Sequence, residues 1–506
     1  MKSIQTKVHF DKPILWVVFV IYLILFAYAI VHHELWGDEI HSWNISKGSE
    51  DYFNLISNTR YEGHPPVWYS ILWTISKFTH DPSNMQAVQF VIASLVIFFV
   101  LFFSPYSILE KILLPFGYFF LFEYGIFTRN YTIGVLLAVC ICMIMKRQFY
   151  GKTTCYYVLL FLLSNTHLFG IILAASLHLY FLMAKFEQNQ SPKSVARHII
   201  IGGLILLPSL FFISPPPDGE LNLNFWLDRW NTTQLVLTVQ APLRGFLPIP
   251  AWWIDNFWNT QFLLEAHTNY NWLKFVSPVI SITIVSLLIL VLKDNKKCLI
   301  LFLTNLLFSL IISIVIFPLT CARHAGFILI GFLVAYWLYY LANFNEIKKR
   351  WIVVSLLAIQ VIAGGFSIWK DIRLPFSNLE KIGTLVTKVP SDQTIVTDYW
   401  TLNPLSTFLD KPFYCVDLET KKTFLLWDSE ITKIETTPNR YVTGITNLFA
   451  RRNLTKLYMI SLASPQNLYA ADPQLPITYH VTLVDQIEGA IEKGSNLYLY
   501  EIKKSQ

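Results

Sequence analysis

Residues 36–41 read Trp-Gly-Asp-Glu-Ile-His, residues 62–66 read Glu-Gly-His-Pro-Pro, and both follow the first long apolar segment of the chain. These two segments contain five ionisable side chains, namely Asp38, Glu39, His41, Glu62 and His64, whereas the long apolar segments almost lack charge. Ionisable groups at the edge of a membrane need a partner or a function. The stretch therefore predicts a catalytic base and part of a phosphate-binding site.

The composition is that of a polytopic membrane protein. Of the 506 residues, 54% are hydrophobic and 14% are charged, and the mean hydropathy is +0.46. Average soluble proteins carry roughly 25% charged residues. The net charge of +6 does not indicate a nucleic-acid partner, because Lys and Arg are spread over short loops. The six cysteines form no CxxC pair, which argues against a zinc ribbon or a disulfide framework.

About eleven apolar segments are expected to span the membrane, since they approach the ~20 residues that a spanning helix needs. They are residues 14–31, 85–103, 109–126, 131–147, 153–166, 168–185, 199–214, 272–293, 298–318, 323–342 and 351–369. The first has no small-residue cleavage site after it and is interpreted as an uncleaved anchor. Residues 65–79 are short for a span and are expected to form a juxtamembrane helix that begins at Pro65-Pro66. The alternative is that they cross the membrane.

Basic residues predict the orientation of these spans. Three lysines precede the first span, which places the N-terminus in the cytoplasm. With 65–79 outside the membrane, four further basic clusters also become cytoplasmic: Lys146/Arg147/Lys152, Lys185/Lys193/Arg197, Lys293/Lys296/Lys297 and Lys348/Lys349/Arg350. The first loop (32–63), the long loop 215–271 and the polar candidate residues then share the extracytoplasmic face.

The long loop 215–271 is rich in tryptophan, a residue that favours the membrane–water interface. Its tryptophans are Trp226, Trp230, Trp252, Trp253 and Trp258. Interfacial anchoring on the bilayer surface is one interpretation, and a mobile lid over an entrance for a lipid substrate is the other.

The composition changes after residue 370 to that of a soluble domain. Strands are predicted at 394–399, 413–417, 456–461, 478–484 and 497–502, and helices at 402–409 and 442–451. The predicted fold class is therefore a polytopic, all-α membrane bundle (1–370) with a small extracytoplasmic α/β domain (371–506). This domain has no glycine-rich phosphate loop such as GxGxxG.

Asp38 and Glu39 at the outer end of the first span have two interpretations. A carboxylate that is partly desolvated at a membrane rim gains basicity and could take a proton from an attacking hydroxyl. Alternatively, Asp38 simply caps the helix that follows.

His64 precedes a helix start, where free N–H groups attract anions, so a phosphate could bind beside it. It could equally be a polar loop residue. His41 lies three residues after Asp38, on the same face of a helix. Together with Glu62 and His64 it could also bind a divalent cation, although the spacing matches no tight metal motif.

Arg129 and Arg323 each lie at an outer membrane boundary, before Asn130-Tyr131 and His324 respectively. Arginine suits bidentate phosphate binding, but a lone boundary arginine also extends towards lipid headgroups. His167, at the outer end of its span, is either structural or part of an acceptor or metal site.

At these residues the chain resembles the GT-C-fold glycosyltransferases. The nearest branch comprises bacterial relatives of the protein O-mannosyltransferases and of the lipid A aminoarabinose transferase. The resemblance is carried by Trp36-Gly37-Asp38-Glu39, by His-Pro-Pro-x-x-Tyr at 64–69 and by Thr-Arg-Asn-Tyr at 128–131. It extends to about residue 345 and is strongest over 30–135.

The resemblance implies roles for individual residues. Asp38 matches the catalytic base of the family, and Glu39 would assist in the acceptor site. His64 stands where many members have a phosphate-binding lysine, and Arg129 and Tyr131 match the turn before a later span. Arg323-His324 stands where the family has Arg-Tyr. Parts of the family contain a divalent cation, which leaves His41, Glu62 and His167 as candidate ligands or acceptor contacts; no soluble cofactor is implied.

The implied function is transfer of a sugar from a polyprenyl phosphate to an envelope glycan, lipid or protein, with inversion, at the outer face of the plasma (inner) membrane. Two rival classes stay open. A transporter usually has ionisable residues near the membrane midplane and repeated halves, which this sequence lacks. A non-catalytic envelope scaffold would tolerate the loss of Asp38, His64 and Arg323 together.

Overall fold

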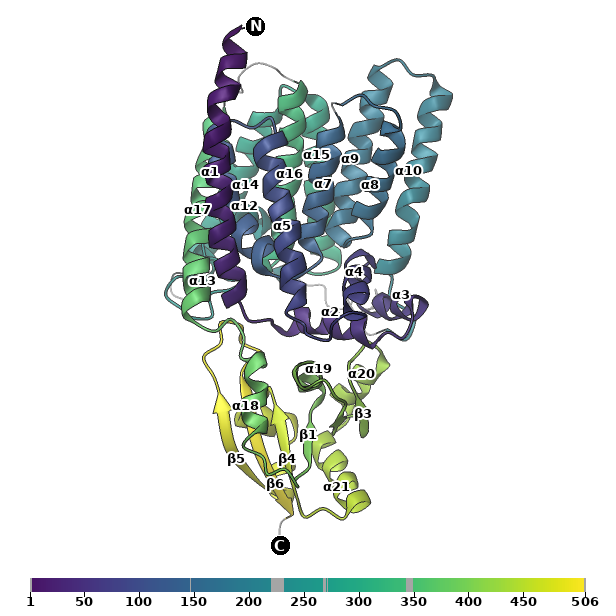
Figure 1. Cartoon of the computed structure of the whole chain (residues 1–506), viewed down its shortest axis with the longest axis vertical. Coiled ribbons are helices and arrows are strands. Elements are labelled where there is room, and N and C mark those ends of the chain that lie inside the picture. The colour runs from purple at the N-terminus through teal and green to yellow at the C-terminus, as the bar shows by residue number, and fades with distance from the viewer. Residues whose placement is uncertain are drawn as a thin grey trace.

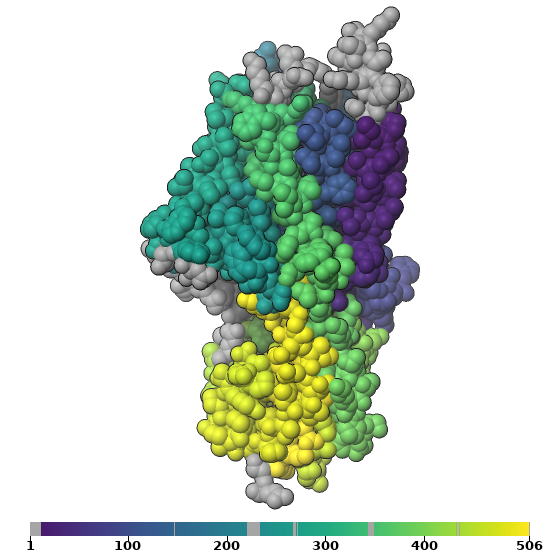
Figure 2. All heavy atoms as spheres, turned by 90° about the vertical axis from the view of Figure 1, so that its left-hand side faces the viewer, coloured from purple at the N-terminus to yellow at the C-terminus, as the bar shows by residue number. Residues whose placement is uncertain are grey.

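The chain forms a helical bundle with a sheet-containing domain at one end (Figure 1). The computed structural model describes residues 2–145, 147–219, 232–266, 270, 272–342 and 349–504. The N-terminus lies at the end of the bundle far from the C-terminal domain. Figure 2 shows the narrow junction where the C-terminal domain meets the bundle. This architecture confirms the predicted fold class.

Eight helices in the described part of the chain are long and apolar enough to cross a membrane. They are α1 (Lys2–His32), α5 (Asn84–Phe103), α9 (Leu168–Glu187), α10 (Pro192–Ile213), α14 (Leu273–Leu292), α15 (Lys296–Val315), α16 (Ala322–Ala342) and α17 (Arg350–Arg373). Two shorter apolar helices correspond to predicted spans, α7 (Tyr131–Met145) and α8 (Lys152–Ser164).

The predicted span 109–126 is not a continuous α-helix. It consists of α6 (Ile108–Leu113), a 3-10 turn (Leu114–Phe116) and a π-helix, η2 (Phe119–Ile126). Pro115 cannot donate a backbone hydrogen bond, so it interrupts regular helix at this point. The π-helix leads directly into the turn that contains Arg129.

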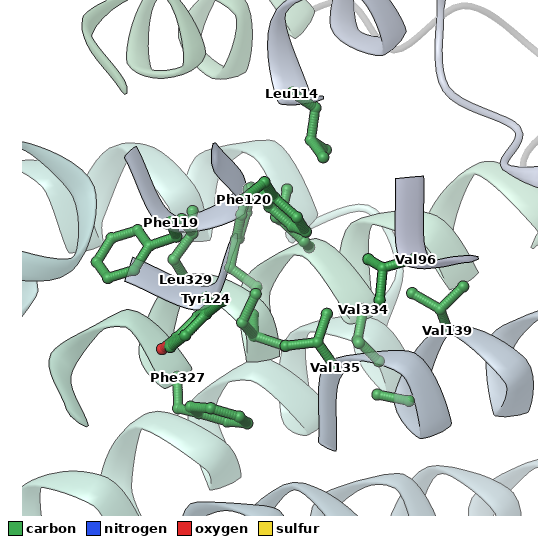
Figure 3. Packing of buried hydrophobic residues seen from close by; sticks show 14 of the residues in the cluster. Val96, Leu114, Phe119, Phe120, Tyr124, Val135, Val139, Phe327, Leu329 and Val334 are labelled. Atoms are coloured by element: carbon green, nitrogen blue, oxygen red, sulfur yellow. The ribbon is translucent and has the colours of Figure 1, made fainter. Parts of the chain in front are cut away.

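Helix α16 forms the centre of the bundle. In its most apolar stretch 83% of the residues are buried, against 17% for α10 at the periphery. Figure 3 shows side chains of α16, η2 and α7 packed together, among them Phe327, Tyr124 and Val135. Gly326 permits this contact, because a Cβ there would lie 2.2 Å from the Phe119 ring. The packing fixes the start of α16, which contains Arg323.

The segment between α1 and α5 forms a small layer at the end of the bundle next to the C-terminal domain (Figure 1). It contains α2 (Gly37–Gly48), α3 (Tyr52–Tyr61) and α4 (Val67–Ser76). Helix α4 corresponds to the predicted juxtamembrane helix. Its 10 residues are too few to cross a bilayer, which needs ~20. The alternative that 65–79 crosses the membrane is therefore wrong.

The long loop 215–271 is only partly a surface loop. Its helix α12 (Thr232–Phe246) packs against α14, α15 and α16, and the hydroxyl of Thr238 donates to Ser313 at 2.8 Å. The prediction of a surface location is thus wrong for α12. Trp252 and Trp253 are exposed, as expected of interfacial anchors. A short helix, α13 (Phe262–Glu265), follows, while Trp226 and Trp230 lie outside the described residues.

The C-terminal domain contains a mixed six-stranded sheet in the order β3-β2-β1-β4-β6-β5. The strands are β1 (Ile395–Thr397), β2 (Phe413–Cys415), β3 (Thr420–Lys422), β4 (Lys456–Ser461), β5 (Tyr479–Ile487) and β6 (Leu497–Lys504). Strand β1 is parallel to β2 and β4, and the other pairs are antiparallel. All five predicted strands are confirmed. Strand β3 was missed because its three residues, Thr-Lys-Lys, form a short polar edge.

Helices cover this sheet and connect its strands. They are α18 (Ile382–Val386), α19 (Tyr399–Leu409), α20 (Ser429–Thr436), α21 (Arg440–Arg452), α22 (Pro465–Ala471) and α23 (Leu475–Thr478). The two predicted helices, 402–409 and 442–451, correspond to α19 and α21.

Helix α19 joins the C-terminal domain to the first loop. Trp43 of α2 and Leu402 of α19 belong to one buried hydrophobic cluster. The amide of Asn44 donates to the backbone oxygen of Asn403 at 2.9 Å, and Thr407 donates to Asn44 at 2.7 Å. The two parts of the chain therefore share a packed core next to Asp38.

Candidate functional site

Asp38 lies in the first turn of α2 and faces a cavity between the bundle and the C-terminal domain. The cavity measures about 610 Å³ and is also lined by His41, Glu62, His64 and Arg129. Trp36, and not Asp38, is the N-cap of α2, so helix capping does not explain the aspartate. The side chain of Asp38 is 39% exposed, enough to meet a ligand.

Two arginines from distant parts of the chain surround Asp38. Its Oδ2 atom lies 3.3 Å from Nη2 of Arg323 and 3.8 Å from Nη2 of Arg129. Arg129 is held in place because its Nη1 donates to the backbone oxygen of Asp38 at 2.5 Å and to the hydroxyl of Ser42 at 2.6 Å. The structure therefore brings together three of the predicted site residues.

Arg323 is positioned by two tryptophans and by the start of α16. Its guanidinium carbon lies 5.2 Å from the Trp36 ring and 5.6 Å from the Trp258 ring, both within the range of cation–π attraction. The side chain of Asn259 accepts from the backbone N–H of Ala322 at 3.0 Å. The interpretation of Trp258 as an interfacial anchor is therefore wrong, since the end of loop 215–271 contributes to the site.

Glu39 is a structural residue and does not line the cavity. Its side chain is fully buried. It accepts from the backbone N–H of Trp36 at 3.0 Å, and from the backbone and hydroxyl of Thr128 at 2.5 and 2.8 Å. Its position does not match the expected contribution to an acceptor site. It connects α2 to the turn that contains Arg129.

His64 lines the cavity after a turn at Gly63, whose φ of +61° favours glycine. Burial and the positive charge of Arg129 lower the pKa of His64 to about 3. The imidazole is therefore neutral at physiological pH in the unliganded protein. It can meet a phosphate as a hydrogen-bond donor but not as a cation.

His41 and Glu62 form a pair on the C-terminal-domain side of the cavity. The Asn403 amide donates to Nδ1 of His41 at 2.7 Å, which leaves Nε2 to donate to Glu62 at 2.8 Å. Among the residues that the structure describes, no three His, Cys, Asp or Glu side chains are arranged to hold a metal ion. His41, Glu62 and His64 line the same cavity but do not form such a set, and His167 does not line the cavity.

Tyr131, His324 and His167 form a separate cluster beneath the arginines. Nε2 of His324 lies 3.1 Å from the Tyr131 hydroxyl, and the rings of Tyr131 and His167 are 4.9 Å apart. His167 is the N-cap of α9 and accepts from the backbone N–H of Gly170. None of the three lines the cavity, so they support the site from behind.

The basicity of Asp38 differs from the sequence prediction. Burial alone raises the pKa of this carboxyl, as expected, but Arg129 and Arg323 outweigh burial and hold the pKa below its ordinary value. The prediction of raised basicity is therefore wrong for the unliganded site. The carboxylate stays deprotonated, which is the state that a general base requires.

Several buried donors around Asp38 lack a hydrogen-bond partner among the described residues. They are Nε of Arg129, Nε and Nη1 of Arg323, Nδ1 of His64 and the indole nitrogen of Trp36. Buried polar groups in native proteins are normally satisfied. A cluster of unsatisfied donors, three of them on the two guanidinium groups, fits a phosphate or similar anion.

Sequence reasoning missed a buried ionic chain behind the site. Nδ1 of His33 lies 3.1 Å from Asp371 at the end of α17, and Nε2 lies 3.8 Å from Glu39. Burial lowers the pKa of His33, but the two carboxylates outweigh it and raise the pKa to about 10. The sequence signal for this ionic chain was Asp371, a charged residue just after the last predicted span that has no assigned role.

Replacing His33 with glutamine is expected to destabilise the protein most at low pH. A histidine with a raised pKa stabilises the fold fully below its ordinary pKa of about 6.5. That contribution falls as pH rises through about 10. Breaking a buried pair costs roughly 3–5 kcal/mol. Thermal unfolding in detergent should therefore show the largest Tm difference between His33→Gln and wild type at pH 6, with a smaller one near pH 10.

His32→Gln is the matched control, because His32 is the exposed neighbouring histidine. A Tm difference for His33→Gln that does not change with pH would contradict the ionic role of His33.

Solved structures show the same fold. No family model and no curated protein matches the chain. The structure of ArnT from Cupriavidus metallidurans bound to undecaprenyl phosphate aligns with a TM-score of 0.51 and 13% identity, over 98% of each chain. Its apo state aligns with a TM-score of 0.53 and 12% identity, over 99% of this chain and 98% of ArnT. The chain therefore has the fold of ArnT, and the predicted resemblance is confirmed at the level of the fold.

Proposed function

We propose that this protein is a membrane glycosyltransferase that takes a sugar from a polyprenyl-phosphate donor. The observation that supports this most is the meeting of Asp38, Arg129 and Arg323 at one cavity. The cavity lies at the end of an apolar bundle, where a lipid tail can stay in the membrane while its phosphate reaches the arginines. ArnT, which shares the fold, has been solved with undecaprenyl phosphate.

The proposed orientation puts the cavity and the C-terminal domain outside the cytoplasm, at the plasma (inner) membrane. Two of the basic residues, Lys152 and Lys296, are the first residues of α8 and α15. Both helices begin at the end of the bundle far from the C-terminal domain (Figure 1). An excess of Lys and Arg marks the cytoplasmic side.

The proposed reaction is a single displacement. An acceptor hydroxyl attacks the anomeric carbon of the sugar and gives its proton to Asp38, while the bond between that carbon and the phosphate oxygen breaks. The leaving polyprenyl phosphate gains negative charge, which Arg129, Arg323 and neutral His64 stabilise. Direct displacement inverts the anomeric configuration.

Donor binding also adjusts the base. The arginines that hold the pKa of Asp38 low are those that would bind the phosphate. The donor is a phosphodiester with one negative charge, which partly offsets their positive charge, so the pKa of Asp38 rises once the donor is present. The carboxylate of Asp38 is therefore most basic in the complex with the donor, in which the proton transfer takes place.

This coupling is expected to separate two pH profiles. The acid limb is the part of a pH profile in which the rate falls as the base becomes protonated. For kcat/KM of the donor it reports the pKa of the base in the unliganded enzyme, and for kcat it reports the pKa in the complex with the donor. Because the pKa of Asp38 is lowered only in the unliganded site, the acid limb of kcat should lie at higher pH than that of kcat/KM. Steady-state kinetics from the lowest pH at which the protein stays folded up to pH 8 would check this, and identical limbs would contradict the coupling.

The function itself is tested by mass spectrometry of envelope glycans from cells with and without the gene. Loss of a sugar modification, restored by wild type but not by Asp38→Asn, is the expected result. A transporter is the second candidate class, but the ionisable side chains of this site lie at the end of the bundle. Ion-driven uptake into proteoliposomes, without any change in envelope glycans, would favour it.

A further inference from the structure

The cavity that contains Asp38 has a second wall, formed by the C-terminal domain. Trp400, Asn403, Trp427 and Asn467 lie on this wall. Nothing in the proposed donor site uses them. They lie on the side of Asp38 opposite to α16 and its arginine, where an acceptor must approach.

This wall coincides with the ends of two parallel strands. Strand β1 ends at Thr397 and is followed by Asp398, Tyr399 and Trp400, while β4 ends at Ser461 and is followed by Leu462 and Ala463. Five of these residues line the cavity: Asp398, Tyr399, Trp400, Leu462 and Ala463. The carboxyl ends of β1 and β4 thus form a crevice of the C-terminal domain, and this crevice opens towards Asp38.

The topology of the sheet makes this crevice a preferred binding position. From β1 the chain passes through α19 to β2 on one side, and it later returns through α21 to β4 on the other side of β1. Neighbouring strands whose connections leave in opposite directions form a crevice at their carboxyl ends, and ligands of open α/β sheets bind there.

The side chains of the crevice suit a carbohydrate. Trp400 is 44% exposed and lines the cavity, so its ring is available to a ligand. Its ring lies 5.8 Å from that of Trp427, which in turn lies 5.9 Å from the His41 ring. Flat aromatic faces cover the apolar C–H face of a sugar ring, and the Asn467 amide, Lys493 and Ser495 at the rim can bond to hydroxyl groups.

The distance from this crevice to Asp38 is set by packing. Asn403 bonds to both His41 and Asn44, so α19, which contains Trp400, is fixed to α2, which contains Asp38. A ligand held on the two tryptophans therefore lies at a preset distance from the base. Such preorganisation is what orients an acceptor hydroxyl for attack.

We infer that the crevice at the carboxyl ends of β1 and β4 is the acceptor subsite, and that it binds a glycan through Trp400 and Trp427. This inference rests on the proposed transferase function and assigns its acceptor to the carbohydrate class. A protein or lipid acceptor would not need a pair of aromatic faces above a polar crevice.

The test is saturation-transfer NMR on the full-length protein in a detergent without a sugar headgroup, since a maltoside would occupy the crevice. The probes are methyl glycosides of glucose, galactose, mannose and N-acetylglucosamine. At least one should bind to wild type, and Trp400→Ala and Trp427→Ala should each weaken binding about tenfold, which is about 1.4 kcal/mol and within the range of aromatic contacts. Trp400→Phe keeps an aromatic face and should bind nearly as wild type.

Trp252→Ala and Trp253→Ala are the matched controls, because these exposed tryptophans lie outside the cavity. Binding of undecaprenyl phosphate, measured in parallel, separates the two proposals. If the lipid binds but no glycoside does, or if glycoside binding survives the double variant Trp400→Ala/Trp427→Ala, the acceptor assignment is overturned. If undecaprenyl phosphate itself does not bind to wild type, the donor assignment fails instead.

Discussion

Asp38→Asn is expected to lower the rate of sugar transfer about 10²–10⁴-fold, which is the contribution of a positioned general base. Asparagine has the same shape and can still accept from Arg323, but it cannot take up the hydroxyl proton. The loss should therefore fall on kcat, while donor binding should be at least as tight as in wild type, because the variant lacks the carboxylate charge beside the phosphate. Transfer of radiolabelled sugar from a polyprenyl-phosphate donor to envelope fractions measures it.

Asp51→Asn is the control for this substitution. Asp51 is the N-cap of α3 in the same loop, and its side chain accepts from the backbone N–H of Asn54 at 2.8 Å. Asparagine caps a helix as well as aspartate does, so this variant should transfer sugar at the wild-type rate. Near wild-type transfer by Asp38→Asn would refute the assignment of the base.

Arg323→Gln is expected to lower transfer about 10²–10³-fold, as the loss of one oxyanion-stabilising donor does elsewhere. In the proposed mechanism Arg323 acts on two charges, since it would neutralise the leaving phosphate and it lies 3.3 Å from Asp38. Its removal also takes away a cation that lowers the pKa of Asp38. The acid limb of kcat/KM should therefore move to higher pH in this variant.

Arg373→Gln provides the matched comparison. Arg373 is exposed, ends α17 near the C-terminal domain, and lies 4.8 Å from the Trp369 ring, so it too contacts a tryptophan. It should transfer sugar normally. If Arg323→Gln retained both the rate and the acid limb, Arg323 would have no part in the reaction.

The bundle could be predicted because its spans are long, apolar and bounded by basic loops. The site could be predicted in part, because Asp38, His64 and Arg129 are polar residues at positions where a membrane protein rarely keeps them without a function. The predictions that failed concern contacts between residues that are far apart in the sequence. The burial of Glu39, the insertion of α12 into the bundle and the position of Trp258 beside Arg323 follow from packing that no local pattern reports.

The lowered pKa of Asp38 is the clearest such case. The sequence places the aspartate at a membrane rim, where desolvation raises basicity. It cannot show that Arg323, 285 residues away, lies close enough to reverse the direction. The ionic chain of Asp371, His33 and Glu39 likewise joins three separate parts of the chain.

The most direct test is a structure of the full-length protein in lipid nanodiscs with undecaprenyl phosphate. The phosphate should lie within hydrogen-bonding distance of Arg323, Arg129 and His64, beside Asp38, with the lipid tail along the bundle. A phosphate bound elsewhere, with Asp38 and Arg323 still paired to each other alone, would contradict the proposed catalytic site.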